Sequence, residues 1–328
     1  MIEVVAKNPD TVTMRVTVRR LAVYLDNWAI VALAKDRTGL REGFLRALQN
    51  GADVLFSVTN ASEIVGPTGA SQDAVREFFT AIGPNWIPIE GPSIVDVMER
   101  EAKGEGRESC IAHDLLRKFF AGRNIQLHGE QRIDFVQPGF FDLGFFLDWL
   151  APQRDEIRRT MVSFDIVLRE KLRQLRRGYD QNKSRFGSVM PRPTYNANTP
   201  ATFCWNGLIR LLVLEGKAYQ WKRGDSADFC HALLAASYSQ FATLDKHWKR
   251  RIELLPTPNS LASVYYEPEL DRFVADVERA VVASPYLRHP LSAGDPAVGL
   301  SLSGFASTSP SSKVLRVCCM RPREPRAN

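Results

Sequence analysis

The chain has 328 residues, of which 45% are hydrophobic and 24% are charged, and its formal net charge is +6. This composition is that of an ordinary globular protein and excludes a mainly disordered, collagen-like or fibrous chain. No run of residues approaches the ~18 apolar positions that a membrane-spanning helix requires, so a membrane partner is not expected. The cysteines show no CxxC spacing, and we therefore expect a cytoplasmic protein with reduced thiols.

Strand and helix signals alternate over the first part of the chain. After an N-terminal extension at residues 1–19, which contains a strand-like stretch, the apolar run at 21–25 predicts a buried strand. A second buried strand follows at 53–58, and residues 86–89 predict a short strand whose proline places it near an edge. Helical patterns lie between these strands. Residues 20–90 therefore predict the first part of an α/β domain with a parallel sheet.

The middle of the chain, residues 91–220, is mostly helical and predicts an insertion into that domain. Its most apolar segment, 139–150, is expected to pack into the insertion's own core. The segment 154–185 combines many basic residues with interspersed aromatic ones, which favours contact with a nucleic-acid backbone. The alternative interpretation of 154–185 is a solvated helix face whose charges pair along the helix.

The last part of the chain returns to the α/β pattern over residues 221–284. The elements predicted there are a helix at 226–238, strands at 239–244 and 252–255, and a last helix at 268–283. The tail at 285–328 is rich in Ser, Pro, Gly and Arg and is predicted to be disordered. The chain therefore reads as one α/β domain in two parts, with a helical insertion and a tail.

Acidic residues follow the predicted strands at their carboxyl ends. Asp26 ends the first strand and Glu63 follows the second; Asp225 and Asp228 open the helix near 226, and Asp245 follows a later strand. Because the carboxyl ends of parallel strands meet at one edge of a sheet, we expect these carboxylates to converge. Converging carboxylates repel one another unless a cation is present. An all-oxygen ligand set favours Mg²⁺ or Mn²⁺, which can hold phosphate oxygens and activate water.

Each acid also has a purely structural interpretation. The stretches Asn60–Glu63 and Asp225–Asp228 each fit a capping box at the start of a helix. Asp26 and Asp245 fit turns. His231 and His247 are candidates for a position near the acidic site, but a histidine such as His231 on an Ala-rich helix is more typical of a packed core residue. The position of all the acids at one edge of the same predicted sheet favours the functional interpretation.

Several stretches resemble the motifs of PIN-domain ribonucleases. In Val23–Ile30 an apolar strand ends in Leu-Asp and an apolar helix follows, as in the opening of that family. Ser57–Glu63 is similar to its second motif, and Asp225–Ala232 with Phe241–Lys246 resembles its closing half, where a strand ends in Thr-x-Asp. The resemblance implies a PIN-like α/β/α sandwich with a central parallel sheet, interrupted by a mostly helical insertion, and metal-dependent endoribonuclease activity.

The resemblance also assigns roles to single residues. The metal-holding and catalytic residues that it implies are Asp26, Glu63, Asp228 and Asp245. Thr243 would hydrogen-bond to a carboxylate and orient it, and Asp225 competes with Asp228 for the third acidic position. Asn27 is a supporting residue only, because it follows Asp26 directly, whereas the family's common opening places one small residue between the two.

The implied substrate is RNA, and the sequence leaves DNA open as an alternative. A protein inhibitor and a second copy of the chain are further partners that the resemblance suggests. The residues that would hold an RNA backbone are Arg169, Lys171, Arg173, Arg176 and Arg177. The leading alternative to an enzyme is a PIN-like scaffold that binds RNA or protein without catalysis.

Overall fold

A five-stranded, all-parallel sheet lies at the centre of the protein, with the strand order β5-β4-β3-β6-β7. The computed structural model describes residues 2–8, 11–16, 21–36, 38–64, 70–116, 142–222, 224–256, 261–283 and 299–301. The strands of the central sheet are β3 (Leu21–Tyr24), β4 (Ala52–Ser57), β5 (Trp86–Ile89), β6 (Phe241–Thr243) and β7 (Ser263–Tyr265). The predicted α/β class with a parallel sheet is therefore confirmed.

The strands are apolar because both faces of the sheet are covered. Every residue of β4 and β5 is buried, as expected for a parallel sheet between helices, whose strands read as continuous apolar runs. Pro88 of β5 pairs with Phe56 of β4 at one edge of the sheet. An edge is where a residue without a backbone N–H is tolerated, so the predicted edge position of residues 86–89 is confirmed.

The direction of the strand order reverses at β3. The chain passes from β3 to β4 and β5 on one side, and later returns to place β6 and β7 on the other side. β3 and β6 are neighbours with Tyr24 opposite Ala242. Open parallel sheets bind their ligands at the carboxyl ends of strands where the order reverses. The strand order therefore predicts a ligand site at the carboxyl ends of β3 and β6.

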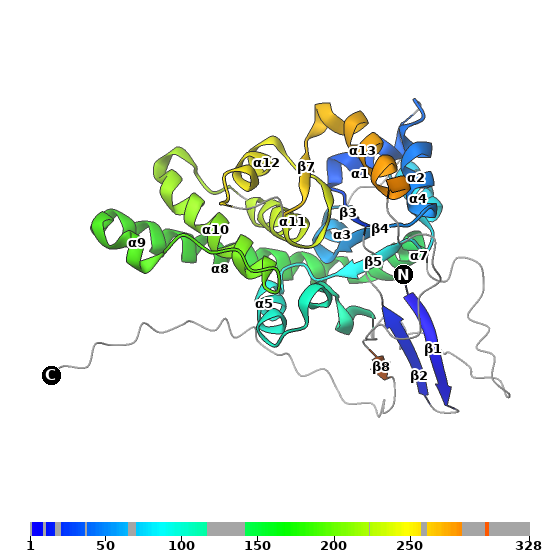
Figure 1. Cartoon of the computed structure of the whole chain (residues 1–328), viewed down its shortest axis with the longest axis horizontal. Helices are drawn as coiled ribbons and strands as arrows, with labels where there is room; N and C mark the ends of the chain where they lie inside the picture. Colours follow the sequence, from blue (N-terminus) through cyan, green and yellow to red (C-terminus); the bar gives the residue numbers. More distant parts are fainter. Residues whose placement is uncertain are drawn as a thin grey trace.

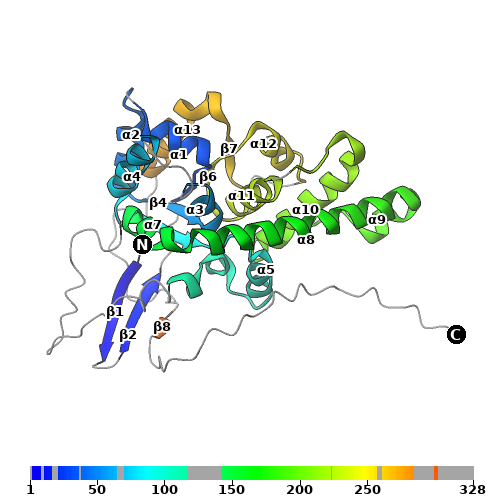
Figure 2. The same ribbon diagram turned by 180° about the vertical axis from the view of Figure 1, so that it is seen from behind.

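Helices cover both faces of the sheet (Figures 1 and 2). On one side, contacts join the helices α1 (Asn27–Ala34), α2 (Leu40–Gln49), α4 (Ala70–Ile82) and α13 (Leu270–Ala283). On the other side, α11 (Asp225–Tyr238) contacts β3 and β6. The helices packed around α11 are α3 (Val58–Ile64), α8 (Arg154–Gln181), α10 (Pro200–Glu215) and α12 (Lys246–Glu253).

Glu101 fixes α10 and α11 relative to each other. It lies in α5 (Ile94–Ala102) and is buried. Its carboxylate accepts hydrogen bonds from the backbone N–H groups of Ala201 (2.7 Å) and Thr202 (2.9 Å) at the start of α10. It also accepts one from the hydroxyl of Tyr238 (2.8 Å) at the end of α11. A carboxylate at a helix N-terminus is favoured by the helix dipole, so this contact holds α11 in place against the sheet.

The helix α8 is the longest element and extends away from the sheet together with α9 (Phe186–Val189) and part of α10 (Figure 2). Its 28 residues span about 42 Å at 1.5 Å per residue. Its buried positions, among them Ile157, Met161, Leu168 and Leu172, follow a helical spacing. Among the described residues, no helix is both long enough and apolar enough to cross a lipid bilayer.

The apolar segment 139–150 does not pack within the insertion alone. Its described part forms α7 (Leu143–Leu150), and Phe146 lies with its ring centroid 4.7 Å from that of Trp86 in β5 and 6.5 Å from that of Phe56 in β4. The expected separate core is therefore wrong for these residues. The aromatic face of α7 completes the core of the central sheet.

The predicted strand at 252–255 is also wrong. Residues 246–253 form α12, and the last strand of the sheet, β7, comes later in the chain. Trp248 and Ile252, four residues apart, are both buried, which is the spacing of one helix face. A short apolar run does not by itself distinguish a strand from the buried face of a helix.

A second, antiparallel sheet forms at the N-terminus. It contains β1 (Ile2–Asn8), β2 (Thr11–Val16) and β8 (Gly299–Ser301) in the order β1-β2-β8. The predicted extension at 1–19 thus contains a hairpin. The predicted disordered tail at 285–328 lies outside the described residues except for β8, whose pairing with β2 contradicts disorder at 299–301.

Candidate metal centre

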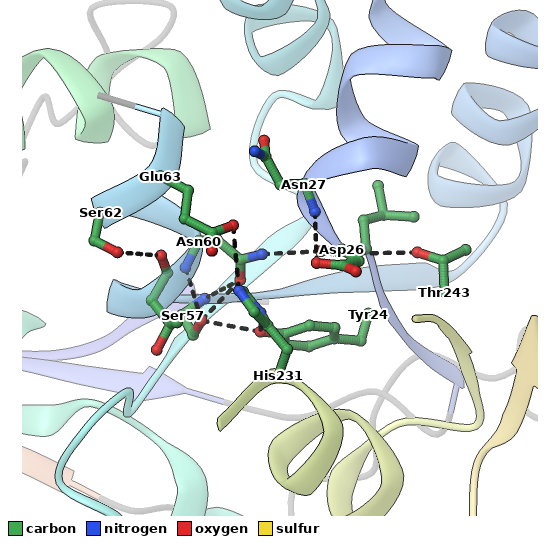
Figure 3. Close-up of polar contacts among 11 residues, drawn as sticks. Tyr24, Asp26, Asn27, Ser57, Asn60, Ser62, Glu63, His231 and Thr243 are labelled. Atoms are coloured by element: carbon green, nitrogen blue, oxygen red, sulfur yellow. Dashed lines mark hydrogen bonds and ion pairs between the residues drawn. The ribbon is translucent and has the colours of Figure 1, made fainter. Parts of the chain in front are cut away.

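Asp26 lies where the strand order of the sheet reverses, and hydrogen bonds to two elements fix it there. It is the N-cap of α1, and its carboxylate accepts a hydrogen bond from the backbone N–H of Asn27 (2.8 Å). Its own backbone N–H donates to Oγ1 of Thr243 at the end of β6 (2.9 Å). The hydroxyl of Thr243 therefore orients the backbone of Asp26, where the sequence predicted a bond to a carboxylate. Asn27 contributes its backbone, and its side chain points away from His231 (Figure 3).

Glu63 reaches the same place from α3, which begins directly after β4. Asn60 is inside this helix, so the predicted capping box with Asn60 as the N-cap is wrong. The Oδ1 atom of Asn60 accepts hydrogen bonds from the backbone N–H (3.0 Å) and Oγ (2.8 Å) of Ser57, and its Nδ2 donates to the backbone oxygen of Leu25 (2.9 Å). Asn60 thus ties the end of β4 to the end of β3 and places Glu63 beside Asp26.

His231 completes the group from the opposite side. Only 1% of it is exposed, and its ring projects from α11 toward Glu63 and the Tyr24 hydroxyl (Figure 3). Its Nδ1 lies 2.6 Å from the hydroxyl oxygen of Tyr24, and its Nε2 lies 3.4 Å from Oε2 of Glu63. One ligand atom each from Asp26, Glu63 and His231 lies within 4.8 Å of the others. Among the described residues, this group has the composition and spacing of a metal site.

The sequence favoured a core position for His231 over one near the acidic site and did not predict it as a metal ligand. It is in the core, but its ring also points into the acidic cluster. One signal in the sequence identifies it: His231 follows Asp228 by three residues on a helix, and residues with that spacing lie on the same face. Once Asp228 is placed in the site, His231 has to be near it.

Asp228 and Asp245 surround the group formed by Asp26, Glu63 and His231, but they are not members of it. Burial raises the pKa of Asp228 to about 7; the charge of His231 lowers it, and the carboxylates of Asp26, Glu63 and Asp245 raise it further. Asp245 is exposed at the N-cap of α12 and makes no capping bond there. Both acids therefore contribute negative charge around the three closest ligands.

Asp225 and Asp228, the two candidates for the third acidic position, differ in their contacts. Asp225 is the first residue of α11 after the N-cap Gly224, and its carboxylate accepts a hydrogen bond from the backbone N–H of Lys222 (2.5 Å). It also bonds to the hydroxyl of Tyr219. The predicted capping box with Asp225 as the N-cap is wrong. Asp225 is held by the loop before α11, while Asp228 is coupled to the acidic cluster.

The electrostatics of the group follow from burial and mutual repulsion. Burial raises the pKa of Asp26 to about 6, with repulsion from Glu63 acting in the same direction and the charge of His231 opposing it. For His231, burial lowers the pKa, but attraction to Glu63, Asp26 and Asp228 outweighs it and raises the pKa to about 9. Without a metal ion, an imidazolium therefore neutralises part of the acidic charge at neutral pH.

The three closest residues fit a divalent cation, but not with the all-oxygen ligand set that the sequence predicted. Asp26 and Glu63 supply carboxylate oxygens, and His231 supplies a ring nitrogen. Nε2 of His231 is buried and makes no hydrogen bond to any described residue. A protonated Nε2 pairs with Glu63 at 3.4 Å, but in the neutral imidazole it is a buried polar atom without a partner, which is unfavourable, and a bound cation beside the two carboxylates would give it one.

The predicted RNA-binding residues lie on α8, and the structure divides them into two groups. Arg169 and Arg173 pair with acids of the same helix, and Arg176 donates two hydrogen bonds to a backbone oxygen of α10. Lys171 and Arg177 are exposed. The first three side chains stabilise the protein itself, so Lys171 and Arg177 are the better candidates for contact with a phosphate backbone.

No protein-family model matches this chain, and no curated protein and no solved structure matches it either. Its function has to be argued from its own residues. The features that bear on function are the acidic cluster at the reversal point of a parallel sheet, the buried imidazole that faces it, and the oxygen and nitrogen atoms that they direct to one place.

Proposed function

We propose that this protein is a PIN-like, metal-dependent endonuclease that cleaves phosphodiester bonds of RNA. The observation that carries the proposal is the convergence of Asp26, Glu63 and His231 at the carboxyl ends of β3 and β4, next to the reversal of the strand order. The PIN-domain resemblance implies Asp228 and Asp245 as members of the metal-holding set, but they lie outside the closest group and would add negative charge near it. The fold is compatible with a PIN-like α/β/α sandwich, which is the finer assignment that we propose.

The chemistry expected of such a site requires a cation. A bound Mg²⁺ or Mn²⁺ would neutralise charge on the scissile phosphate and lower the pKa of a nearby water molecule. Asp26 and Glu63 would hold the cation, and Asp228 and Asp245 would balance its charge from farther out. Thr243 and Asn27 fix the backbone and the carboxylate of Asp26 through hydrogen bonds, so the ligand geometry exists before substrate binds.

A cleavage assay with the purified full chain tests this proposal. Labelled single-stranded RNA, and DNA of the same sequence, would be incubated with Mg²⁺, with Mn²⁺ or with a chelator. The variant is Asp26→Asn, because asparagine is also a good N-cap and preserves the start of α1. We expect cleavage of RNA to fall by at least about 100-fold, since charge stabilisation by a metal ion contributes several kcal/mol.

The matched control is Asp155→Asn, which makes the same change at an exposed position of α8 and should retain full activity. Cleavage that is unaffected by Asp26→Asn, or an absence of cleavage with either ion on either nucleic acid, overturns the proposal. If the protein cleaves DNA in preference to RNA, the proposed nuclease mechanism stands and the substrate is DNA.

A non-catalytic scaffold is the second candidate, and one observation favours it. The buried imidazolium of His231 neutralises part of the acidic charge without any metal ion, so the cluster is compatible with a purely structural role. Calorimetric titration with Mn²⁺ separates the two candidates. A scaffold should bind no ion at millimolar concentration, whereas the proposed nuclease should give a saturable heat that Asp26→Asn abolishes.

A further inference from the structure

We propose that His231 is itself a metal ligand through Nε2, and that the site therefore binds first-row transition ions such as Mn²⁺ more tightly than Mg²⁺. This inference deepens the proposed function and rests on it in one respect: that Asp26 and Glu63 hold a cation. It concerns which atoms bind the ion, and it can be tested without any cleavage assay.

The first step of the argument fixes the direction of the hydrogen bonds at Asn60. Its Nδ2 must be the atom that faces the backbone oxygen of Leu25, because only a donor can bind there. Its Oδ1 therefore faces Ser57, where it accepts a hydrogen bond from the backbone N–H. The hydroxyl of Ser57, 2.8 Å from the same Oδ1, must then donate its only hydrogen to it.

The second step carries this direction to His231. Because the hydrogen of the Ser57 hydroxyl is already used, the contact between Ser57 Oγ and the Tyr24 hydroxyl (3.0 Å) requires Tyr24 to be the donor. The oxygen of Tyr24 is then left as an acceptor toward Nδ1 of His231, 2.6 Å away. The chain of bonds from Asn60 through Ser57 and Tyr24 thus assigns a hydrogen to Nδ1 of His231.

The third step concerns the other ring nitrogen. With Nδ1 protonated, a neutral imidazole carries its lone pair on Nε2, which is the form in which histidine binds metals. Nε2 is buried, has no hydrogen-bond partner among the described residues, and faces Glu63 at 3.4 Å. Metal-binding histidines nearly always donate their other ring N–H to a fixed acceptor, which orients the ring. Tyr24 supplies that acceptor.

The ligand set then determines which ions are preferred. Mg²⁺ binds mainly oxygen atoms and retains several of its waters. An imidazole nitrogen suits transition ions, whose affinity for a given site rises from Mn²⁺ through Fe²⁺ and Co²⁺. Two carboxylates and one imidazole held within 4.8 Å of one another therefore favour a transition ion, and replacing the imidazole should reduce that preference.

Pulsed electron paramagnetic resonance of the Mn²⁺-loaded full chain tests the inference directly. A nitrogen atom bound to Mn²⁺ modulates the electron spin echo, and replacing ¹⁴N by ¹⁵N in the protein's histidines changes the modulation frequencies. We expect this change in the unaltered chain. His231→Gln should abolish the modulation, while His247→Gln, an exposed position near Asp245, should leave it unchanged.

Calorimetry tests the role of Tyr24. Tyr24→Phe should weaken Mn²⁺ binding by about 10-fold or more, as is usual when the partner of a ligating histidine is removed, and should weaken Mg²⁺ binding less. The matched control is Tyr265→Phe, another buried tyrosine, whose hydroxyl bonds to Asp276 of α13 outside the site. It should retain the affinity of the unaltered chain for both ions.

The outcomes separate this inference from the proposed function. Saturable Mn²⁺ binding with no nitrogen modulation overturns the ligand role of His231 and leaves the nuclease proposal standing. Nitrogen modulation in a protein that cleaves neither RNA nor DNA confirms the ligand and overturns the nuclease. An absence of Mn²⁺ binding overturns both. The isotope experiment shows without any substitution whether a histidine binds Mn²⁺, and the comparison of His231→Gln with His247→Gln identifies which one.

Discussion

At the scale of single residues, the environment of His231 makes the stability of the protein depend on pH. Its pKa is raised from 6.5 to about 9 by Glu63, Asp26 and Asp228 against the effect of burial. A histidine with a raised pKa adds stability that is fully present below pH 6.5 and is lost as the pH rises through about 9. The pKa values of Asp26 and Asp228 are also raised, to about 6 and about 7. They too make the protein less stable as the pH rises, because ionising these acids in the folded protein is unfavourable.

We therefore expect the metal-free protein to be less stable at pH 9.5 than at pH 6. Urea unfolding measures the difference in the free energy of unfolding between the two pH values. His231→Gln should reduce that difference by an amount on the order of 1 to 3 kcal/mol, since each unit of pKa shift corresponds to about 1.4 kcal/mol. The control His247→Gln, at an exposed position, should show the same difference in the free energy of unfolding between the two pH values as the unaltered chain. An equal pH dependence in all three proteins would contradict the charged state of His231.

The acids of the site could be predicted from the sequence, whereas the histidine could be placed there only through its helical spacing from Asp228. Asp26 and Glu63 follow apolar runs that alternate with helical patterns and so predict buried strands, and the geometry of a parallel sheet then brings their positions together. His231 lies in a helix that is buried almost throughout, so no apolar stripe shows which way the ring points. Its direction depends on Tyr24 and Glu63, which are far away in the chain.

At the scale of elements, the strands with continuous apolar runs and the amphipathic helices were predicted well, and the partners of the helices were not. Periodicity shows that a helix has a buried face, but not what covers it. α7 illustrates the limit: the pattern of residues 143–150 predicts burial, and only the structure shows that Phe146 lies against Trp86. The strand predicted at 252–255 failed for the related reason that a short apolar run fits two structures.

The packing of α7 gives a direct test. Phe146 is 1% exposed, whereas the neighbouring Phe145 is 41% exposed. Phe146→Ala should lower the free energy of unfolding by about 3 to 5 kcal/mol, the usual cost of emptying a buried aromatic site. Phe145→Ala should cost much less. Denaturant unfolding of both variants checks this, and similar losses would mean that α7 does not complete the core of the sheet.

At the scale of the whole molecule, the net charge of +6 matters only where the cations are available to a partner. Arg169, Arg173 and Arg176 have partners within the chain, so counting basic residues in the sequence overestimates the binding surface on α8. Lys171 and Arg177 are exposed on that helix. If they contact the phosphates of RNA, their removal should change how binding depends on salt.

We expect the double variant Lys171→Ala/Arg177→Ala to bind single-stranded RNA more weakly. The slope of log K against log salt concentration should decrease in magnitude by about 1.4, since each phosphate contact on a single strand contributes about 0.7. Fluorescence anisotropy at several salt concentrations measures this slope. Arg272→Ala/Arg279→Ala, which removes the same charge from exposed positions of α13, should leave it unaltered. An unchanged slope in the α8 variant would mean that RNA binds elsewhere.

The pairing of β3 with β6 also has a consequence for how the protein is made. β3 is synthesised long before its neighbour β6, because the threonine of β6 that holds Asp26 comes 217 residues later in the chain. The imidazole on α11 is also near the end of the described chain. A growing polypeptide therefore carries Asp26 and Glu63 without the groups that organise them until α11 and β6 have been synthesised. The order of synthesis therefore makes this group of side chains one of the last features of the fold that can form.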